Sequence, residues 1–153
     1  MLSRRDWLRA SVAGVASALV TRPLLAEALT DAPTKITVYK SSTCGCCKEW
    51  VKHLQVNGFS VSAHDVDDVD SVRRTMGVPD TLASCHTAVV GRYVIEGHVP
   101  ADLIMKLLAD KPALLGLAVP GMPSSAPGMD GPKQPYDVIA FERNGNSRLY
   151  AQR

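Results

Sequence analysis

One segment of the chain joins a strand pattern, a cysteine cluster and a helix pattern: KITVYKSSTCGCCKEWVKHLQV, residues 35–56. Residues 35–39 are rich in β-branched and aromatic side chains and predict a short strand. Over residues 48–56 the apolar side chains recur at helical spacing, and Asn57-Gly58 ends the pattern. The cysteine cluster is therefore expected between a strand and the start of a helix.

The alternation of strand and helix patterns continues further along the chain. The remaining patterns predict strands at residues 59–63, 87–90 and 93–95, and helices at residues 67–76 and 100–109. The order β-α-β-α-β-β-α predicts an α/β fold and resembles the thioredoxin fold. This resemblance implies that the loop with Cys85-His86-Thr87 packs against the cysteine cluster. Thioredoxins usually carry a cis-proline followed by threonine in that loop, whereas this chain has His86 before Thr87.

Residues 34–111 are expected to form the thioredoxin-like domain, and residues 112–153 are expected to extend it. Five prolines and four glycines fall within residues 116–135, which predicts a Pro/Gly/Met loop and no packed element. Residues 136–151 predict a C-terminal β-hairpin that turns at Asn144-Gly145. Neither an internal repeat nor a second domain is indicated.

The first 28 residues have the features of a signal peptide. Ser3-Arg4-Arg5-Asp6-Trp7-Leu8 resembles the twin-arginine export motif, and residues 10–20 form a modestly apolar run. Ala26-Glu27-Ala28 fits a cleavage site for small residues. The apolar run is shorter than the roughly 20 residues that span a membrane. We therefore expect export to the periplasm by the twin-arginine route and no transmembrane segment in the mature chain. The alternative is an uncleaved membrane anchor.

Removal of the signal changes the charge of the chain. The whole sequence has 17 basic and 15 acidic residues, and residues 1–28 contain four arginines and two acidic residues, so the mature chain has 13 of each. A formally neutral chain argues against a nucleic-acid partner, which requires a basic surface. The remaining 125 residues suffice for one small domain. In an oxidising compartment, free thiols tend to form disulfides unless a metal or a reductant protects them.

All four cysteines of the chain belong to two short motifs, Cys44-Gly45-Cys46-Cys47 and Cys85-His86. Cys44 and Cys47 have the spacing of a thiol–disulfide pair, but a dithiol has no need of Cys46. The start of a helix favours thiolates, which are the ligands of soft metals. Adjacent residues are expected to point apart, so Cys46 and Cys47, or Cys85 and His86, should not easily bind one ion together. A single zinc ion would leave sulfurs unused, whereas several Cu(I) ions bridged by thiolates would engage all four.

Four motifs in order carry a family resemblance: Cys44–Trp50, Ser84–Ala88, Glu96–Ala101 and Val119–Pro123. They look like those of the periplasmic CopG-type copper-resistance proteins, and the resemblance covers roughly residues 34–142. It implies a thioredoxin-like fold with a cysteine-bridged copper site that has accessible redox states. By this match the metal ligands are Cys44, Cys46, Cys47 and Cys85, with His86 adjacent.

Further side chains are candidates for outer ligands of such a site. His98 either binds metal or accepts a proton there, or it caps the helix that opens at Pro100. Met122 and Met129 either offer thioethers to copper or simply contact the core. His53 is expected at the surface or in packing, and His64 is expected to be structural. For Trp50, two roles are open: shielding the cluster from water or filling the core.

The sequence thus favours a periplasmic copper-binding protein of copper resistance that holds more than one Cu(I) ion and cycles between Cu(I) and Cu(II). Its expected partners are copper ions and other periplasmic copper-handling proteins. The main alternative is a thiol–disulfide oxidoreductase with Cys44 as nucleophile and Cys47 as resolving thiol. Zinc storage is a further alternative. Disulfide stapling remains as well, but a Cys44–Cys47 bridge would add only roughly 2 kcal/mol of stability and a Cys44–Cys85 bridge roughly 4 kcal/mol.

Overall fold

The computed structural model describes residues 32–153, which form one compact unit. The twin-arginine motif and the predicted signal peptide, residues 1–28, lie outside the described residues. Within residues 32–153, no helix is long and apolar enough to cross a membrane.

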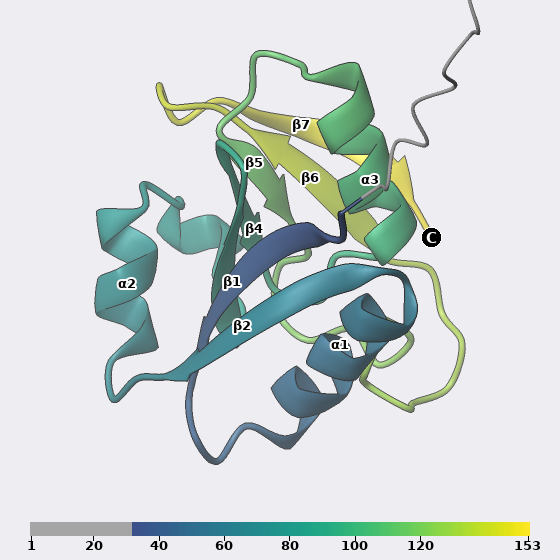
Figure 1. The fold of residues 1–153 in the computed structure, drawn as a ribbon. Helices are drawn as coiled ribbons and strands as arrows, with labels where there is room; N and C mark the ends of the chain where they lie inside the picture. Colours follow the sequence, from purple (N-terminus) through teal and green to yellow (C-terminus); the bar gives the residue numbers. More distant parts are fainter. Residues whose placement is uncertain (1–31) are drawn as a thin grey trace, which may run out of the picture. The chain divides into compact units, whose positions relative to one another are not determined.

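The described residues build a mixed seven-stranded sheet in the order β2-β1-β3-β4-β5-β6-β7 (Figure 1). The strands are β1 (Thr34–Lys40), β2 (Phe59–Asp65), β3 (His86–Val90), β4 (Tyr93–Glu96), β5 (Gly116–Ala118), β6 (Asp137–Phe141) and β7 (Ser147–Gln152). The pairs β1–β2 and β4–β5 are parallel, and the other neighbouring strands are antiparallel. The structure is therefore of the mixed α/β class that the sequence predicts.

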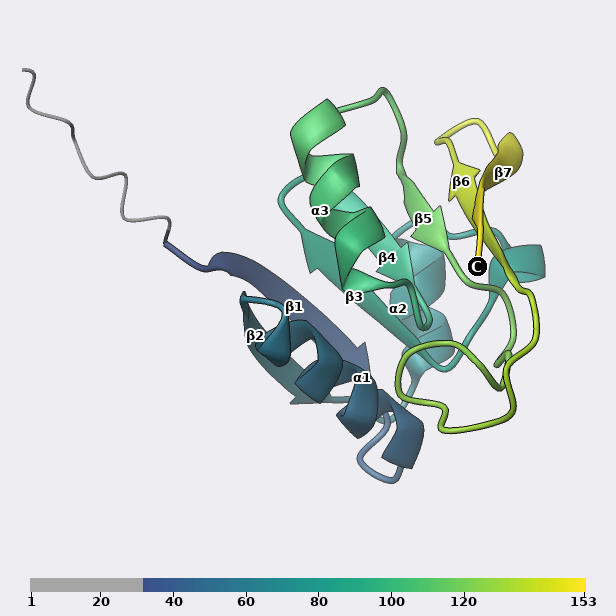
Figure 2. The same cartoon turned by 90° about the vertical axis from the view of Figure 1, so that its right-hand side faces the viewer.

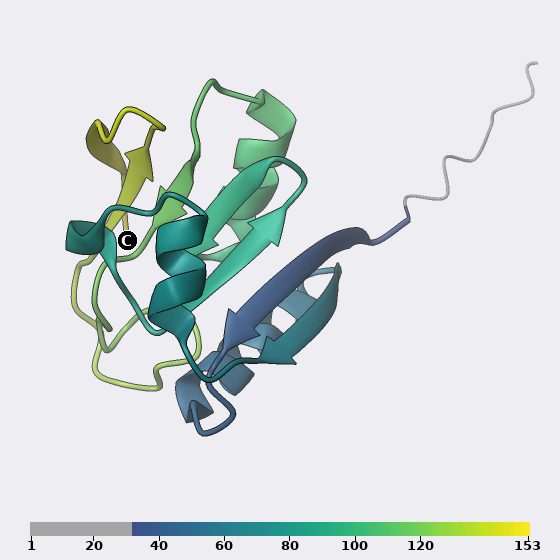
Figure 3. The same cartoon turned by 90° about the vertical axis from the view of Figure 1, so that its left-hand side faces the viewer.

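Three α-helices and one short 3₁₀ helix cover the sheet: α1 (Gly45–Val56), α2 (Val69–Thr75), η1 (Asp80–Leu82) and α3 (Ala101–Asp110). Figure 2 shows α1 and α3 together on one face, and Figure 3 shows α2 on the opposite face. The larger core cluster includes Trp50 and Leu54 of α1 and Ile104 of α3, and the smaller one gathers around Leu82 and Phe141. Each face of the sheet thus has its own apolar layer.

The order of elements up to α3 confirms the predicted β-α-β-α-β-β-α, with η1 as an addition. The start of α1 differs from the prediction, because the helix begins at Gly45 and not at Lys48. The backbone of Cys44 is extended, and its sulfur accepts a hydrogen bond from the backbone N–H of Cys47 at 3.3 Å. This contact caps the helix, so that Cys46 and Cys47 belong to the first turn.

The prediction of a loop throughout residues 116–135 is wrong for its first three residues, which form strand β5. All three are buried, and β5 joins β4 to β6 in the sheet. Gly116 is required here, since a Cβ atom at this position would lie 1.8 Å from the carbonyl oxygen of Val94. A strand of three residues is too short to produce an alternating pattern, and its glycine reads as a turn signal.

The C-terminal hairpin is confirmed. Strands β6 and β7 pair antiparallel, and the backbone N–H of Glu142 donates to the carbonyl of Asn146 at 2.9 Å across the turn. Gly145 lies in the turn with a φ of +86°. Residues after α3 therefore add β5, β6 and β7 next to β4, on the side of the sheet opposite the β2 edge.

Candidate metal centre

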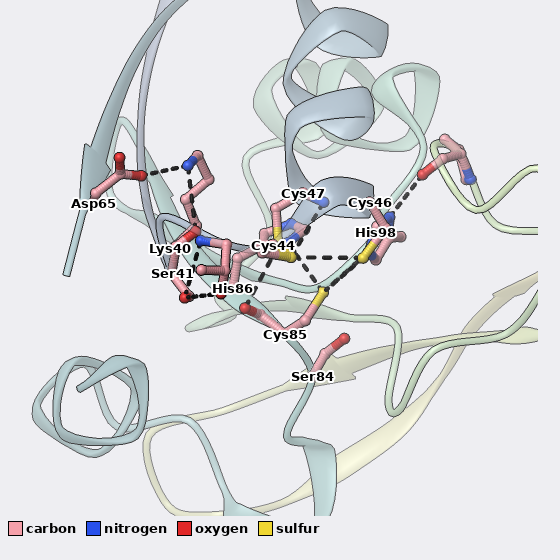
Figure 4. Close-up of a disulfide and its surroundings, with 12 residues drawn as sticks. Lys40, Ser41, Cys44, Cys46, Cys47, Asp65, Ser84, Cys85, His86 and His98 are labelled. Atoms are coloured by element: carbon pink, nitrogen blue, oxygen red, sulfur yellow. Dashed lines mark hydrogen bonds and ion pairs between the residues drawn. A yellow bond between two sulfur atoms is a disulfide. The ribbon is translucent and has the colours of Figure 1, made fainter. Parts of the chain in front are cut away.

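The two cysteine motifs meet at one end of the sheet (Figure 4). Cys44 ends the connection from β1 to α1, and Cys46 and Cys47 lie in the first turn of α1. Cys85 directly precedes β3, and His98 lies between β4 and α3. Because β3 pairs with β1 in the sheet, the residue before β3 comes close to the connection that follows β1.

The sulfur atoms of all four cysteines lie within 4.8 Å of one another. The Sγ atom of Cys46 is 3.6 Å from that of Cys44 and 4.0 Å from that of Cys85. The expectation that Cys85 packs against the first cluster is confirmed. Four sulfurs at these distances can share metal ions.

The expectation that adjacent residues point apart is wrong at both motifs. The sulfurs of Cys46 and Cys47 belong to the same close group. The Sγ atom of Cys85 lies 3.4 Å from the Nδ1 atom of His86. Cys46 and Cys47 lie in the first turn of α1, and Cys85 lies at the end of a loop just before β3. The side-chain directions of an ideal helix or strand therefore do not apply to these residues.

Cys44 and Cys47 are joined by a disulfide, whereas Cys46 and Cys85 are free thiols. The spacing that predicted a thiol–disulfide pair therefore corresponds to the observed bond. The sulfur of Cys47 is fully buried, and it lies 3.7 Å from the backbone carbonyl of Cys85. Only the reduced form of the pair offers four thiolates to a metal.

His98 is fully buried and points toward Cys85. Its Nε2 atom lies 3.0 Å from the Sγ atom of Cys85, and its Nδ1 atom lies 2.7 Å from the carbonyl oxygen of Pro127. A carbonyl oxygen only accepts hydrogen bonds, so Nδ1 carries the proton and Nε2 presents its lone pair to Cys85. Burial lowers the pKa of His98, which keeps the imidazole neutral. A neutral imidazole with its second nitrogen anchored is the state that binds metals.

The cap of α3 is provided by His53 and not by His98. The backbone N–H of Ala101 donates to the Nε2 atom of His53 at 3.1 Å. The sequence predicts His53 at the surface or in packing. No pattern around His53 indicates that it caps a helix that begins 48 residues later. His64 is exposed on β2 and contacts Ser62 at 3.1 Å, away from the cysteines.

His86 is buried between the cysteines and the core. Its ring lies 4.3 Å from the ring of Trp50, and the indole N–H of Trp50 donates to the carbonyl of Val99 at 2.9 Å. Burial, followed by the neighbouring His98, lowers the pKa of His86 to about 3. The Nε2 atom of His86 has no hydrogen-bond partner among residues 32–153. Trp50 therefore fills the core, as one of its two predicted roles states, and packs against His86 beside the site.

The loop after β5 closes over the first turn of α1. Gly128 has a φ of +86°, and a Cβ atom there would lie 2.6 Å from the backbone nitrogen of Trp50. Only glycine allows this close approach, which holds the carbonyl of Pro127 against His98. Met129 packs against the core, which is one of the two roles predicted for it. Met122 is 59% exposed and lines a cavity of about 400 Å³ together with Cys85.

A buried ion pair that the sequence did not predict supports the Cys85 segment from behind. The Nε atom of Arg73 lies 2.8 Å from Glu96, which also accepts hydrogen bonds from the backbone N–H of Ser84 at 2.7 Å and from the hydroxyl of Thr87 at 2.6 Å. Burial raises the pKa of Glu96, and these hydrogen bonds act in the opposite direction. One carboxylate thus fixes the residues on both sides of Cys85 and His86. Within the sequence, nothing pairs Arg73 with Glu96 before the fold is known.

A second charged pair lies on the other side of the site. Lys40 is buried at the end of β1 and forms an ion pair with Asp65 at the end of β2 (Figure 4). The two residues face each other in the register of the parallel strands. The positive charge of Lys40 is one of the smaller influences that lower the pKa of His86.

The thiol of Cys85 is protonated over the whole neutral range. Burial, followed by the nearby Cys46, raises its pKa to about 12. Cys85 also belongs to two overlapping groups of ligand atoms, the four sulfurs and a set with His86 and His98. The cluster can therefore hold metal through sulfur alone or through sulfur and imidazole, and binding at Cys85 must displace a proton.

Comparisons with known proteins agree with this arrangement. A family model described as "Protein of unknown function, DUF411" matches residues 82–129, which include Cys85 and His98. The chain is 42% identical to two solved structures named "Copper resistance protein copG- Form 2" and "Copper resistance protein copG- Form 1". Each match covers 79% of this chain and 98% of the solved chain, with TM-scores of 0.75 and 0.74. No curated protein matches the chain.

Proposed function

Because the chain belongs to the family of the copper resistance protein CopG, we propose that it binds Cu(I) in a cysteine-bridged site as part of copper resistance. The proposed ligands are the sulfurs of Cys44, Cys46, Cys47 and Cys85, with the Cys44–Cys47 pair reduced. His86 and His98 complete the site on the side of the core.

The proposal rests on one observation, the distance of no more than 4.8 Å among all four sulfurs. A thiolate can bridge two ions, and soft thiolates select Cu(I) over harder cations. The four mutually close sulfurs come from two chain segments, and with the imidazoles of His86 and His98 they make six donors, two more than one tetrahedral ion uses. We therefore expect more than one Cu(I) ion per chain.

The histidines supply the remaining donors in this proposal. His98 presents the lone pair of Nε2 toward Cys85, and His86 places Nδ1 3.4 Å from the same sulfur. Cys85 thus acts as the common ligand of the sulfur group and the imidazole group. An imidazole donor also tolerates Cu(II), which supports cycling between Cu(I) and Cu(II) at this site.

Met122 is proposed as an outer ligand that receives incoming copper. Its thioether is exposed and lines the same cavity as Cys85, so it offers a soft donor at the entrance. Met129 is not equivalent, because it packs against the core cluster.

The cellular setting is part of the same proposal. Residues 1–28 would direct export to the periplasm by the twin-arginine route, where other copper-handling proteins would exchange metal with this chain. The interpretation of the fold as thioredoxin-like is supported by the parallel β1–β2 pair, the antiparallel β1–β3 and β3–β4 pairs, and the cysteines at the start of α1.

Anaerobic titration of the reduced, metal-free protein with Cu(I) tests this function, with bound copper counted by elemental analysis. The wild type should retain more than one copper per chain, and Cys46→Ser should retain fewer. Met105→Leu, which removes an exposed sulfur on α3 remote from the cysteines in sequence, should match the wild type. One retained zinc ion and no retained copper would contradict the proposal and favour zinc storage.

A thiol–disulfide oxidoreductase is the second candidate, and the observed Cys44–Cys47 disulfide favours it. In that function Cys44 attacks a substrate disulfide and Cys47 resolves the mixed disulfide. Reduction of insulin disulfides would then be lost in Cys44→Ser and retained in Cys46→Ser. Loss of copper capacity in Cys46→Ser together with no insulin reduction by the wild type would select the copper function.

A further inference from the structure

We propose that the cysteine site divides between two chemical tasks when it meets Cu(II). Cys44 and Cys47 supply the electrons that reduce the metal. Cys46, Cys85 and His98 then retain a Cu(I) ion produced by that reaction. This inference rests on the proposed copper-binding function and adds an electron source and a retention site to it.

The oxidised form of the Cys44–Cys47 pair, which has given up two electrons, fits the fold. The folded chain holds the two residues with a Cα–Cα distance of 5.4 Å, within the range of ordinary disulfides, and their sulfurs are bonded. In the same fold the helix begins normally and Cys47 stays buried in its first turn. The oxidised form of the pair is therefore compatible with the complete site.

Oxidation of this pair leaves a second set of soft donors intact. Cys46 and Cys85 remain free thiols 4.0 Å apart, and the Nε2 atom of His98 lies 3.0 Å from Cys85. The two thiolates can hold one Cu(I) ion between them, and His98 adds an imidazole donor beside Cys85. The hydrogen bond from His98 Nδ1 to the carbonyl of Pro127 keeps the third donor in place while the disulfide is formed.

The two sets are close enough for the ion to be reduced and kept within one site. Cys46 lies 3.6 Å from Cys44, so a Cu(II) ion bound between these sulfurs contacts both the electron source and the retention set. The two pairs of cysteines cannot exchange these roles. A bond between Cys46 and Cys85 would remove both retaining sulfurs, whereas the bond between Cys44 and Cys47 removes neither.

The reaction balances with Cu(II) as the oxidant. Two Cu(II) ions each accept one electron and become Cu(I). The thiols of Cys44 and Cys47 release two protons to solvent, and their sulfurs form one S–S bond. Each reduced chain thus converts two ions in a single turnover, retains one Cu(I) on Cys46, Cys85 and His98, and releases the other to a competing ligand.

The test uses the full chain, reduced and metal-free, and adds two equivalents of Cu(II) without oxygen. Cu(I) is counted with a chromogenic chelator after denaturation, and disulfides are located by alkylation and peptide mapping. We expect two Cu(I) ions per chain, a fall from four thiols to two, and a single disulfide between Cys44 and Cys47. After removal of loosely bound metal, one copper per chain should remain.

Two double variants separate the electron source from the retention set. Cys46→Ser/Cys85→Ser should still reduce two Cu(II) ions but retain no copper. Cys44→Ser/Cys47→Ser should retain one ion when it is supplied as Cu(I). His98→Gln should form the same disulfide as the wild type and lose retained copper, which distinguishes a ligand from a residue needed for folding.

A disulfide between Cys46 and Cys85, or Cu(II) bound without loss of thiols, would overturn the inference. Both results come from the wild type and do not depend on the folding of any variant. Direct titration with Cu(I) separates this failure from failure of the proposed function. If the reduced protein binds Cu(I) but Cu(II) produces no Cys44–Cys47 bond, only the division of tasks is wrong.

Discussion

The Nε2 atom of His98 lies 3.0 Å from the Sγ atom of Cys85, while its Nδ1 atom is held by the carbonyl of Pro127. Three segments far apart in sequence thus set the protonation state of one ring. The anchored Nδ1 leaves Nε2 with a lone pair directed at a thiol that belongs to the sulfur cluster. This geometry leaves His98 available as a metal donor, whereas the cap of α3 comes from His53.

Replacement of His98 by glutamine should weaken Cu(I) binding by at least about tenfold, because the anchored imidazole donor is lost while an amide of similar size remains. Competition with a Cu(I) chelator measures this change. His53→Gln is the matched control, since His53 caps α3 and lies outside the sulfur group. It should lower the free energy of unfolding by about 1 kcal/mol and leave copper affinity unchanged. Equal copper affinity in the two variants would contradict the role of His98.

Gly128→Ala should loosen the loop that anchors His98. A Cβ atom at this position would lie 2.6 Å from the backbone nitrogen of Trp50, so the loop must move away from α1. The carbonyl of Pro127 would then no longer fix Nδ1, and nitrogen NMR of the His98 ring should report a mixture of tautomers. Copper affinity should fall by roughly tenfold or more.

Gly145→Ala provides the control for backbone strain. Gly145 also has a φ of +86°, but nothing lies within 4 Å of the position of its Cβ atom. Both substitutions therefore place alanine in the same unfavourable conformation, and only Gly128→Ala adds a collision beside the site. If both variants keep a single His98 tautomer, the close approach at Gly128 is not what orients the ring.

Most of the fold could be predicted because its strands and helices are long enough for the spacing of their apolar residues to show the period of a strand or a helix. The strand before the cysteines, the hairpin at Asn144-Gly145 and the helix after Pro100 are local patterns, and all three are present in the structure. Strand β5 could not be predicted, since three buried residues that include Gly116 carry no period. Its position depends on the neighbouring strand β4 and not on its own sequence.

The candidate site was predictable to the extent that it depends on residue type and element order. The approach of Cys85 to Cys46 follows from the order of elements. The roles of His53 and His98 could not be separated from sequence, because each depends on a partner at least 29 residues away. The same holds for Glu96, whose partner Arg73 lies 23 residues earlier on another element.

Copper affinity should increase with pH throughout the neutral range. The pKa of Cys85 is raised to about 12, so its thiol is protonated in the metal-free protein at every pH below that value. Binding of Cu(I) displaces this proton, and each displaced proton contributes a tenfold gain in affinity per pH unit. Chelator competition between pH 6 and pH 8, roughly one unit on either side of neutrality, measures the slope.

The Cys85→Ser variant identifies the origin of that slope. A serine hydroxyl does not release a proton to Cu(I) in this range, so the slope of log affinity against pH should fall by about one. Met122→Leu should bind copper with the same slope as the wild type, because a thioether has no proton to lose. An unchanged slope in Cys85→Ser would show that this thiol is not a ligand.

The metal-free protein should become less stable as the pH falls below about 6.5. The pKa of His86 is lowered to about 3 in the folded state, first by burial and then by His98, so the unfolded chain binds a proton that the folded chain does not. The free energy of unfolding is then unaffected above the unfolded pKa and decreases by about 1.4 kcal/mol per pH unit between pH 6.5 and pH 3. Urea unfolding at a series of pH values measures this slope.

His86→Leu should remove that part of the pH dependence. Leucine keeps an apolar contact with Trp50 and has no titrating group, so the slope between about pH 6.5 and pH 3 should decrease. The control is His64→Leu, because His64 is exposed on β2. That variant should retain the slope of the wild type. A wild-type slope in His86→Leu would mean that other groups cause the acid sensitivity.

Glu96→Gln should destabilise the metal-free protein by about 3 kcal/mol, because the buried guanidinium of Arg73 loses its buried carboxylate and keeps only the exposed Asp70 as an ion-pair partner. The amide oxygen can still accept the hydrogen bond from the backbone N–H of Ser84, and the amide NH2 can donate to the hydroxyl of Thr87, so the loss mainly reports the charge. Arg73→Met/Glu96→Gln should recover much of the lost stability, since neither charge is then buried alone. Asp110→Asn, which breaks an exposed ion pair with Lys106, should change stability far less. Urea unfolding of the three variants and the wild type measures these differences. If the double variant is no more stable than Glu96→Gln, the pair does not act as a unit behind Cys85.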